Sequence, residues 1–187
     1  VHAEDGNGDE VVPVLLAGNV NICRFVEISG NILTEEGDGV GLTNVFLYKD
    51  GLFEASTVTD DNGYYEFIDL EADRNYDVEP VKDINYLNGV NAGDLARMSS
   101  HVLNEILLNS PYKRIAGDVR PPNTINSGDI SRTRQLILGD VATFTDVDSW
   151  RFVTADHVFA NPDEPTSVAF PERAILNNLQ SNSINQD

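Results

Sequence analysis

Oxygen-bearing side chains recur at short intervals in the stretch "DINYLNGVNAGD", residues 83–94. Calcium is a hard cation that takes about 6–8 oxygen ligands, and a twelve-residue loop entering a helix supplies them from places one, three, five, seven, nine and twelve. The ligands predicted from this spacing are Asp83, Asn85, Gly89 through its carbonyl, Asn91 and Asp94. Leu87 holds the fifth place, where its backbone carbonyl or a water must serve. The stretch therefore predicts a calcium site.

A second stretch, "DVRPPNTINSGD" at residues 118–129, repeats the pattern. Its predicted ligands are Asp118, Thr124, Asn126 and Asp129. Arg120 puts a positive charge at the third place, and Pro122 has no side-chain oxygen to offer at the fifth. We therefore expect this loop to bind calcium more weakly than the first.

A metal-free explanation of both loops remains open. Asp and Asn also form tight turns and helix caps in which no cation takes part. Against that explanation, both stretches keep an aspartate at the first and last places and an asparagine at the ninth, 35 residues apart. A duplicated loop-and-helix unit favours a shared ligand over coincidence.

Each loop leads into a helical pattern. After the first loop, "GDLARMSSHVLNEILL" places Leu95, Met98 and Val102 at helical spacing, and the apolar face is expected to extend through Leu103, Ile106 and Leu107. Asp94 is expected to be the N-cap of this helix. After the second loop, a helix is expected over residues 129–138, closed by Gly139.

The chain before the first loop is β in character. Short alternating stretches from about residue 24 to 81 are separated by the turn signals "EEGDGVG", "KDG" and "DDNG". Five or more short strands at this spacing predict a β-sandwich. The expected fold class is thus α+β, with an all-β sandwich followed by a small helical module of paired calcium loops.

Four segments follow from these patterns. We expect an acidic tail and apolar strand over residues 1–23, the sandwich over 24–82, the calcium module over 83–140, and an extension over 141–187 that packs on the module. No Gly/Ser-rich linker separates sandwich and module, so a fixed interface is expected between them.

The apolar stretch "VVPVLLAGNVNI" at residues 11–22 has two open readings. It can pack on its own domain, or it can add a strand to a sheet edge in a neighbouring chain. Pro13 suits an edge strand better than a central one. A head-to-tail exchange between chains would produce an open filament.

Composition excludes several partners. The formal net charge of -19 argues against nucleic acid and against anionic membrane surfaces. The longest apolar stretches are far shorter than the roughly 20 residues of a membrane span. Cys23 is the single cysteine, which rules out an internal disulfide. The chain begins at Val1 without a signal peptide, so we expect a processed product or part of a longer protein.

Nothing in the sequence predicts catalysis. The three histidines are scattered, and no nucleophile elbow, phosphate-binding glycine loop or zinc spacing is present. Abundant carboxylates always permit a glycosidase-like pair to be imagined, but no spacing supports one. We expect a protein that is not an enzyme.

Two parts of the chain resemble known families. The units "DINYLNGVNAGDLARMSSHVLN" and "DVRPPNTINSGDISRTRQLILG" resemble type I dockerin repeats, whose paired calcium loop-helix units pack antiparallel. The stretch "ISGNILTEEGDGVGLTNVFLYKDG", with the later "DDNGYYEF", is similar to carboxypeptidase-regulatory-like or Cna-B-like sandwiches of the prealbumin type. With "WRFVTADHVFANPDEP", the arrangement resembles large secreted surface proteins of Bacteroidetes, over roughly residues 27–165. Leu87 and Pro122 depart from the dockerin pattern, which has Asp or Asn at the fifth place.

Three functions follow. The first is a non-catalytic structural or adhesive segment of a secreted, cell-surface or extracellular fibre protein, rigidified by Ca2+ and able to self-assemble by strand addition. The second is a dockerin that docks an enzyme or scaffold onto a cohesin partner, although the residues that usually contact cohesin are not evident. The third is the accessory end of a hydrolase. The expected partner is a protein, either copies of this chain or a cohesin-like module, with no nucleic acid and no membrane insertion.

Overall fold

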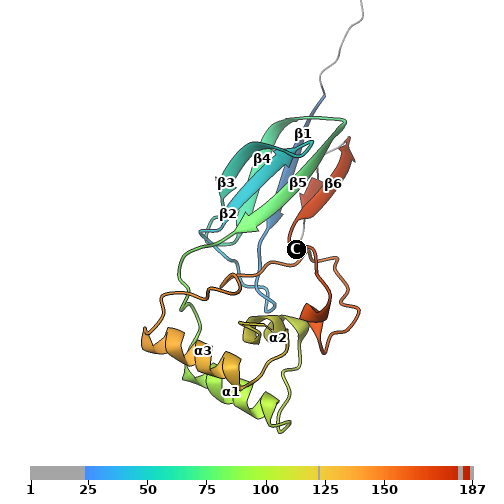
Figure 1. Ribbon diagram of the computed structural model, residues 1–187. Coiled ribbons are helices and arrows are strands. Elements are labelled where there is room, and N and C mark those ends of the chain that lie inside the picture. Colours follow the sequence, from blue (N-terminus) through green and yellow to red (C-terminus); the bar gives the residue numbers. More distant parts are fainter. Residues whose placement is uncertain (1–23, 122, 181–182, 186–187) are drawn as a thin grey trace, which may run out of the picture.

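The computed structural model describes residues 24–121, 123–180 and 183–185. The fold is mixed α+β, with two sheets and three α-helices in the described part of the chain. Figure 1 shows the sheets stacked at one end of an elongated molecule and the helices gathered at the other. The expected tail and apolar strand over residues 1–23 lie outside the described residues.

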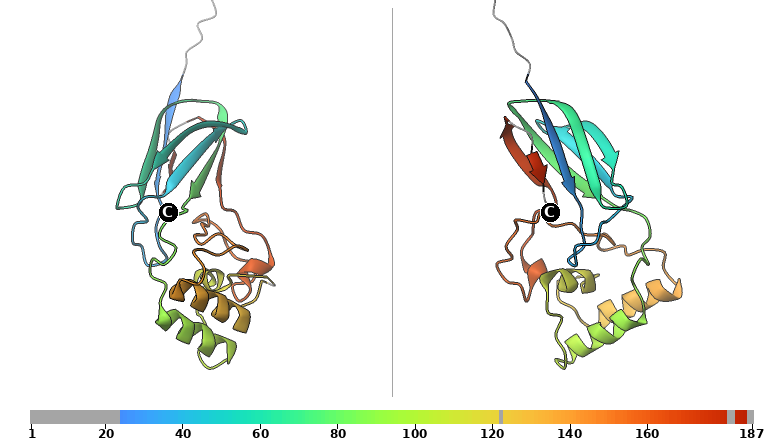
Figure 2. Two further views of the ribbon diagram at one scale, coloured as in Figure 1. Left: turned by 60° about the vertical axis from the view of Figure 1, so that its left-hand side comes forward. Right: turned by 180° about the vertical axis from the view of Figure 1, so that it is seen from behind.

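Within the described residues, seven strands build the two sheets. They are β1 (Phe25–Asn31), β2 (Asn44–Lys49), β3 (Leu52–Val58), β4 (Tyr64–Glu71), β5 (Arg74–Val81), β6 (Ala174–Leu179) and β7 (Ser183–Asn185). One sheet has the order β4-β1-β7 and the other β3-β2-β5-β6. Every pair is antiparallel except β1 with β7. The sheets form two facing layers (Figure 2).

One hydrophobic core lies between the layers. Side chains alternate along the strands, so that Val26 and Ile28 of β1 are buried while Phe25 is exposed. Val45 and Leu47 of β2 meet them from the other sheet, together with the fully buried Tyr76 of β5. This arrangement confirms the β-rich part that the alternating pattern predicts.

The C-terminal stretch lies only in part where it was expected. We expect residues 141–187 to pack on the helical module, and Trp150 and Thr166 do contact its loops. However, β6 pairs with β5 and β7 pairs with β1. Ala174 and Leu176 of β6 pack against the core between the sheets. The strands of residues 24–82 therefore do not form the two sheets alone, and the helices are inserted between β5 and β6. The sequence does not reveal that β6 belongs to the sheet, because β6 is an edge strand that buries only one of its faces.

The helices are α1 (Ala92–Val102), α2 (Pro111–Gly117) and α3 (Ser127–Leu138), with a 3-10 turn η1 at Pro165–Ser167. Helices α1 and α3 lie side by side and run in opposite directions (Figure 1). Gly139 ends α3 at φ 76°, as expected. Each helix here is too short or too polar to cross a lipid bilayer, as far as the described residues go.

Helix α1 is shorter than its apolar pattern predicts. It ends at Val102 because Asn104 turns the backbone to a φ of 57°, a left-handed conformation that terminates helices. The residues expected to extend the buried face are therefore exposed, namely Leu103 at 66%, Ile106 at 73% and Leu107 at 52%. That expectation was wrong because it weighed apolar spacing above the turn at Asn104.

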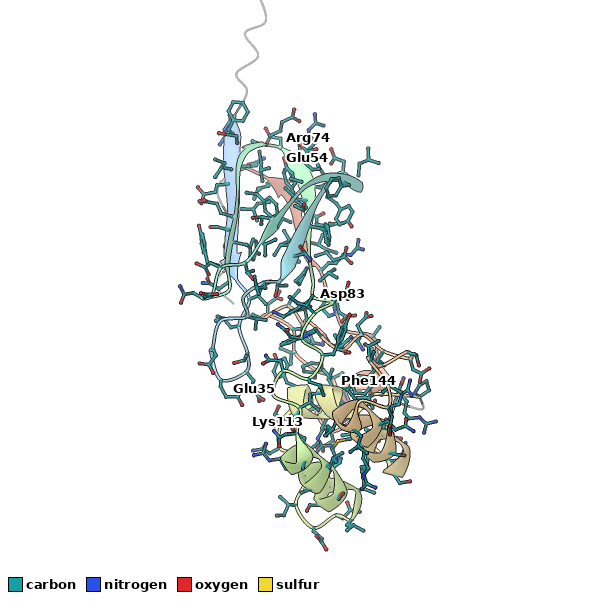
Figure 3. All side chains as sticks on the ribbon, turned by 90° about the vertical axis from the view of Figure 1, so that its left-hand side faces the viewer. Glu35, Glu54, Arg74, Asp83, Lys113 and Phe144 are labelled. Atoms are coloured by element: carbon teal, nitrogen blue, oxygen red, sulfur yellow. The ribbon has the colours of Figure 1, made fainter. Side chains whose placement is uncertain are left out.

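Several contacts join the sheet end to the helical end. Lys113 of α2 lies 3.8 Å from both Glu35 and Glu36 in the loop after β1, as Figure 3 shows for the first pair. Lys82, just after β5, places its ammonium 4.9 Å from the Trp150 ring centroid. Burial lowers the pKa of Lys82. These contacts support the fixed interface that the absence of a linker predicts.

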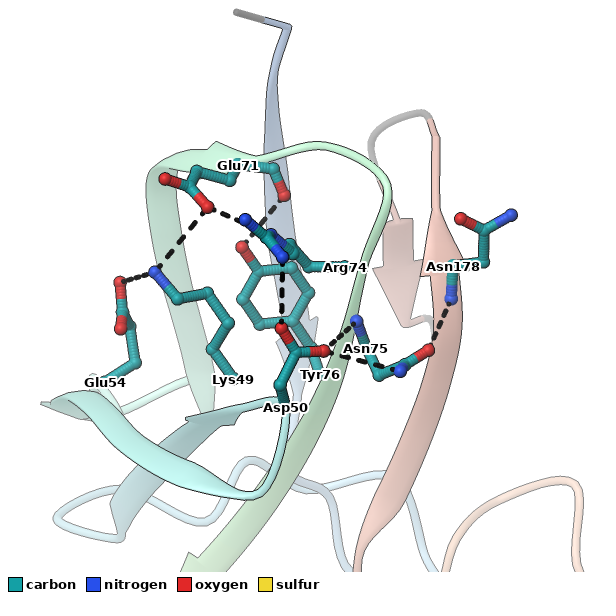
Figure 4. A network of polar contacts seen from close by, with 8 residues as sticks. All are labelled: Lys49, Asp50, Glu54, Glu71, Arg74, Asn75, Tyr76 and Asn178. Carbon is teal, nitrogen blue, oxygen red and sulfur yellow. Dashed lines mark hydrogen bonds and ion pairs between the residues drawn. The ribbon is translucent and has the colours of Figure 1, made fainter.

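Polar side chains form a network of contacts at the end of the sheets that is farther from the helices (Figure 4). Lys49 lies 2.9 Å from Glu54 and 3.9 Å from Glu71. The hydroxyl of Tyr76 donates to the Glu71 carbonyl over 2.9 Å, which satisfies the one polar atom of a fully buried ring.

Candidate metal site

The first loop connects β5 to α1. Figure 3 places Asp83 where the chain leaves the sheets for the helices. Asp83, Asn85 and Asn91 are exposed, and Asp94 is partly buried. Positive φ angles occur at Asn85, 57°, and at Gly89, 77°. These are the third and seventh places, whereas a calcium loop of the helix-loop-helix kind turns sharply at the sixth.

The second loop connects α2 to α3 and has a different backbone. Its positive φ, 39°, is at Asn123, the sixth place, where the calcium loop turns. Asp118 and Asp129, its first and last residues, are both buried, and Asp129 is 0% exposed. The second loop thus has the better backbone and the more enclosed carboxylates, and the first loop has the better donor set.

Both loops end in the same helix cap. In the first, Asn91 accepts from the Gly93 amide over 2.7 Å, and Asp94 accepts from the Asn91 amide over 2.9 Å. The second repeats these contacts through Asn126 and Asp129, over 2.8 and 2.9 Å. Asn91, not Asp94, is therefore the N-cap of α1, with Asp94 at the third helical position. The reciprocal bonds form a capping box, which favours an acidic residue at that position.

The carbonyls predicted to bind calcium sit within the same caps. Gly89 accepts from the Asn91 side-chain amide over 2.9 Å, and Thr124 accepts from that of Asn126 over 2.9 Å. A carbonyl oxygen has two lone pairs, so the Gly89 carbonyl can accept this bond and bind a cation as well. The capping bond and a bound cation are therefore compatible at the seventh place of the first loop.

The buried Asp118 carboxylate of the second loop is perturbed by its surroundings. Burial raises the pKa of Asp118; the Thr166 hydroxyl bond lowers it, the nearby Asp129 charge raises it, and Arg151 lowers it. Asp129 also accepts from the Val119 amide over 3.2 Å. The negative charges of two buried carboxylates repel each other, and a cation bound between them would offset that repulsion.

Arg120 opposes that stabilisation. Its guanidinium lies directly against Gly128 at the start of α3. The positive charge expected at the third place of the loop therefore stays beside the loop.

Residues of the C-terminal extension contact both loops, although the sequence did not indicate which residues would do so. The Trp150 indole N–H donates to the Ile84 carbonyl in the first loop over 3.0 Å. The Thr166 hydroxyl donates to Asp118 in the second loop over 2.7 Å, and the Asn123 side chain donates to the Thr166 carbonyl over 3.2 Å. These partners are 66, 48 and 43 residues apart, so local patterns carry no signal for them.

The donor chemistry fits a hard cation and not a soft one. Among the described residues, no three carboxylate, imidazole or thiol side chains converge on one point. A site in either loop would therefore rely on amide and carbonyl oxygens beside its two aspartates, which is the donor mixture that Ca2+ accepts.

A polar cleft of about 400 Å³ adjoins the second loop. Its lining includes Asp118 and Thr124 of the second loop and Asp163 and Glu164 of the C-terminal extension. His101 of α1 also lines it, and its Nδ1 accepts from the Leu108 amide over 3.3 Å. Burial lowers the pKa of His101, Arg114 lowers it further, and Asp163 opposes the change.

The chain matches no family model and no curated protein.

Proposed function

We propose that the protein is a non-catalytic structural or adhesive segment of a secreted, cell-surface or extracellular fibre protein, rigidified by Ca2+. One observation carries the proposal: two loops of matching sequence end in the same capping box and bring oxygen donors to the start of two adjacent antiparallel helices. The resemblance to dockerin repeats and to a Cna-B-like sandwich, and the division into a sandwich and a calcium module, belong to this proposal.

Calcium would act here as a clamp. In the first loop Asp83, Asn85, Gly89, Asn91 and Asp94 would hold it, and in the second Asp118, Thr124, Asn126 and Asp129 would. Each loop also contacts the C-terminal extension, through Trp150 or Thr166. A cation that orders a loop would therefore also order the segment that carries the chain back to the sheets.

A calcium titration by calorimetry tests the proposal. The matched variants are Asp83→Asn and Asp118→Asn, which remove one charge each without changing shape. We expect two events in the parent protein, with the tighter lost in Asp83→Asn and the weaker lost in Asp118→Asn, because Arg120 opposes a cation in the second loop. Loss of the tighter event in Asp118→Asn would mean that backbone preorganisation outweighs Arg120.

Binding should also appear as stability. A ligand that binds only the folded state stabilises it by about 2.7 kcal/mol at 100 times its dissociation constant. If a chelator leaves the melting temperature unchanged and both variants leave the calorimetry unchanged, the loops are only turns and the calcium clamp is wrong.

Docking to a cohesin is the second candidate. Its support is the antiparallel pairing of α1 and α3, the arrangement that dockerin repeats adopt. A pull-down with cohesin modules tests it, and binding that disappears with a chelator would favour this function over the first.

A further inference from the structure

Strand β3 has one open side. It forms an edge of the four-stranded sheet, pairing with β2, and no other described strand pairs with it. Such an edge presents unpaired N–H and C=O groups that a further strand can pair. Residues 52–58 contain neither proline nor lysine, two residues that proteins use to block open edges.

The outer face along this edge carries two exposed apolar side chains, with the exposed Ser56 between them. Phe53 is 61% exposed and Val58 51% exposed. Phe53 packs beside Phe46 and Tyr48 of β2, with ring centroids 6.5 and 6.3 Å apart. A strand added to β3 would thus find main-chain partners and apolar side chains at the same edge.

The other edges are less receptive. In β4 the register shifts and Asp69 takes a φ of 57°, which interrupts the outer row of main-chain groups. In β6 Asn178 does the same at 51°, and β7 has only 3 residues. The register of β3 also shifts near its start, but Ala55–Val58 pairs regularly with Asn44–Leu47.

The chain carries a segment suited to this edge. Residues 11–23 have no charged side chain, in a chain of net charge -19. After Pro13, the even-numbered positions hold Val14, Leu16, Gly18, Val20 and Ile22, whereas the odd-numbered ones hold Leu15 and Ala17 and then the polar Asn19 and Asn21. This alternation produces one apolar face on an extended strand. Nine extended residues span about 30 Å, which covers the length of β3.

Strand β1 does not offer this segment a place beside itself. Its residues pair with β4 on one side, and Ile28–Gly30 pair with β7 on the other. A hairpin that folded back along β1 would meet these occupied positions. Strand β1 also begins at the end of the molecule farthest from the helices (Figure 1), where a neighbouring copy can be reached.

We propose that residues 14–22 of one copy add to the open edge of β3 in a second copy. The inference rests on the proposed function as a segment of an extracellular fibre protein, and it adds self-assembly by strand addition with an identified donor and acceptor. Donor and acceptor are different surfaces, so the contact is head-to-tail and repeats into an open filament.

Charge placed on the donor strand tests the proposal in the full chain. We expect sedimentation to show species that grow with concentration in the parent protein and in Asn19→Asp. Leu16→Asp should instead remain monomeric at concentrations where the parent is at least half assembled, because its charge falls on the apolar face. Equal assembly of the two variants would overturn the assigned face and with it the docking.

Cross-linking tests the acceptor. Cys23 is the only cysteine and follows the donor directly, so Leu52→Cys and Val58→Cys place a thiol at either end of β3. We expect one of them to produce a disulfide-linked ladder, because a disulfide needs Cβ atoms about 3.5–4.5 Å apart. Ile68→Cys, at a site that is 60% exposed on β4, is the matched control and should produce none.

The outcomes separate this inference from the proposed function. A ladder from Ile68→Cys alone, or assembly without a ladder from either β3 variant, would overturn β3 as the acceptor while leaving strand addition in place. Assembly that survives deletion of residues 1–22 would overturn the donor. A chain that stays monomeric at all concentrations would overturn the inference, and the calcium titration would still decide the clamp.

Discussion

At the scale of single residues, Asp129 and Asp94 hold matching positions in different surroundings. Asp129 is fully buried and accepts from two amides, those of Val119 and Asn126. The Asp94 side chain is 35% exposed and accepts from one amide, that of Asn91. The same residue type therefore caps a helix at both places, but only Asp129 also satisfies a buried group outside its own helix cap.

With a chelator present, we expect Asp129→Ala to lower the free energy of unfolding by about 2–4 kcal/mol, because the substitution leaves the Val119 and Asn126 amides without this partner. Asp94→Ala should cost about 1 kcal/mol, the usual effect of losing a cap contact. Chemical denaturation of both variants measures this. Equal losses would show that the burial of Asp129 adds nothing to its role as a cap. The charge-removing variants for calcium binding are therefore better placed at Asp83 and Asp118.

His101 predicts a pH dependence. Its pKa is lowered in the folded state, chiefly by burial, so the unfolded chain takes up a proton at a higher pH than the folded protein does. More protons are then bound in the unfolded state, and stability falls as pH drops below about 6.5. Replacing the ring by Gln keeps an acceptor for the Leu108 amide.

We expect His101→Gln to lose less stability than the parent protein between about pH 7 and pH 5. Melting curves across that range, with a chelator present, provide the measurement. Parallel pH profiles would mean that His101 titrates alike in the folded and unfolded chains.

At the scale of elements, β6 is the critical segment. Ala174, Leu176 and Leu179 pack against the core between the sheets, although β5 and β6 are almost 100 residues apart, as in the pair Asp77 and Ile175. A Pro or charged residue in β6 would destabilise the fold. Removing the whole strand is the clearer test, because it shows whether residues 24–82 can fold without β6.

Truncation after Arg173 should prevent stable folding of the sheets, because it exposes one side of β5 and part of the core. Deletion of residues 1–22 should leave them folded. Far-ultraviolet circular dichroism and urea denaturation of both proteins provide the comparison. A cooperatively folded chain ending at Arg173 would support the sandwich over residues 24–82 as an independent domain.

At the scale of the whole molecule, the chain crosses between the sheets and the helices twice, once after β5 and once before β6. Lys113 pairs with two glutamates across the junction, and the Lys82 ammonium lies over the Trp150 ring there. Two chain crossings and these contacts restrict motion more than a single linker would.

We therefore expect NMR relaxation to give one rotational correlation time for residues in β2 and in α3, and heating to give one unfolding transition. Exposed ion pairs such as Lys113 with Glu35 contribute little by themselves, so Lys113→Ala should leave both results unchanged. Two distinct correlation times would contradict a fixed junction.

The sequence by itself determined the features that arise between near neighbours. Alternation along β1 and β2, the turn at Gly139 and the matched loops all depend on residues within a few places of one another, where periodicity and turn preference act. The ligand candidates were readable for the same reason, although the capping roles of Asn91 and Asp94 required the backbone to be seen. Apolar spacing failed at Leu103 because Asn104 ends the helix.

Only the tertiary structure decided the contacts between distant residues. Thr166 reaches Asp118, Trp150 reaches Ile84, and β6 returns to β5. Each of these groups could instead have bonded to water or to another segment, because a hydroxyl, an indole N–H and an edge strand can each form hydrogen bonds with many different partners. Which partner is chosen depends on how the core closes as a whole, since burial is gained only when all the segments around it are in place.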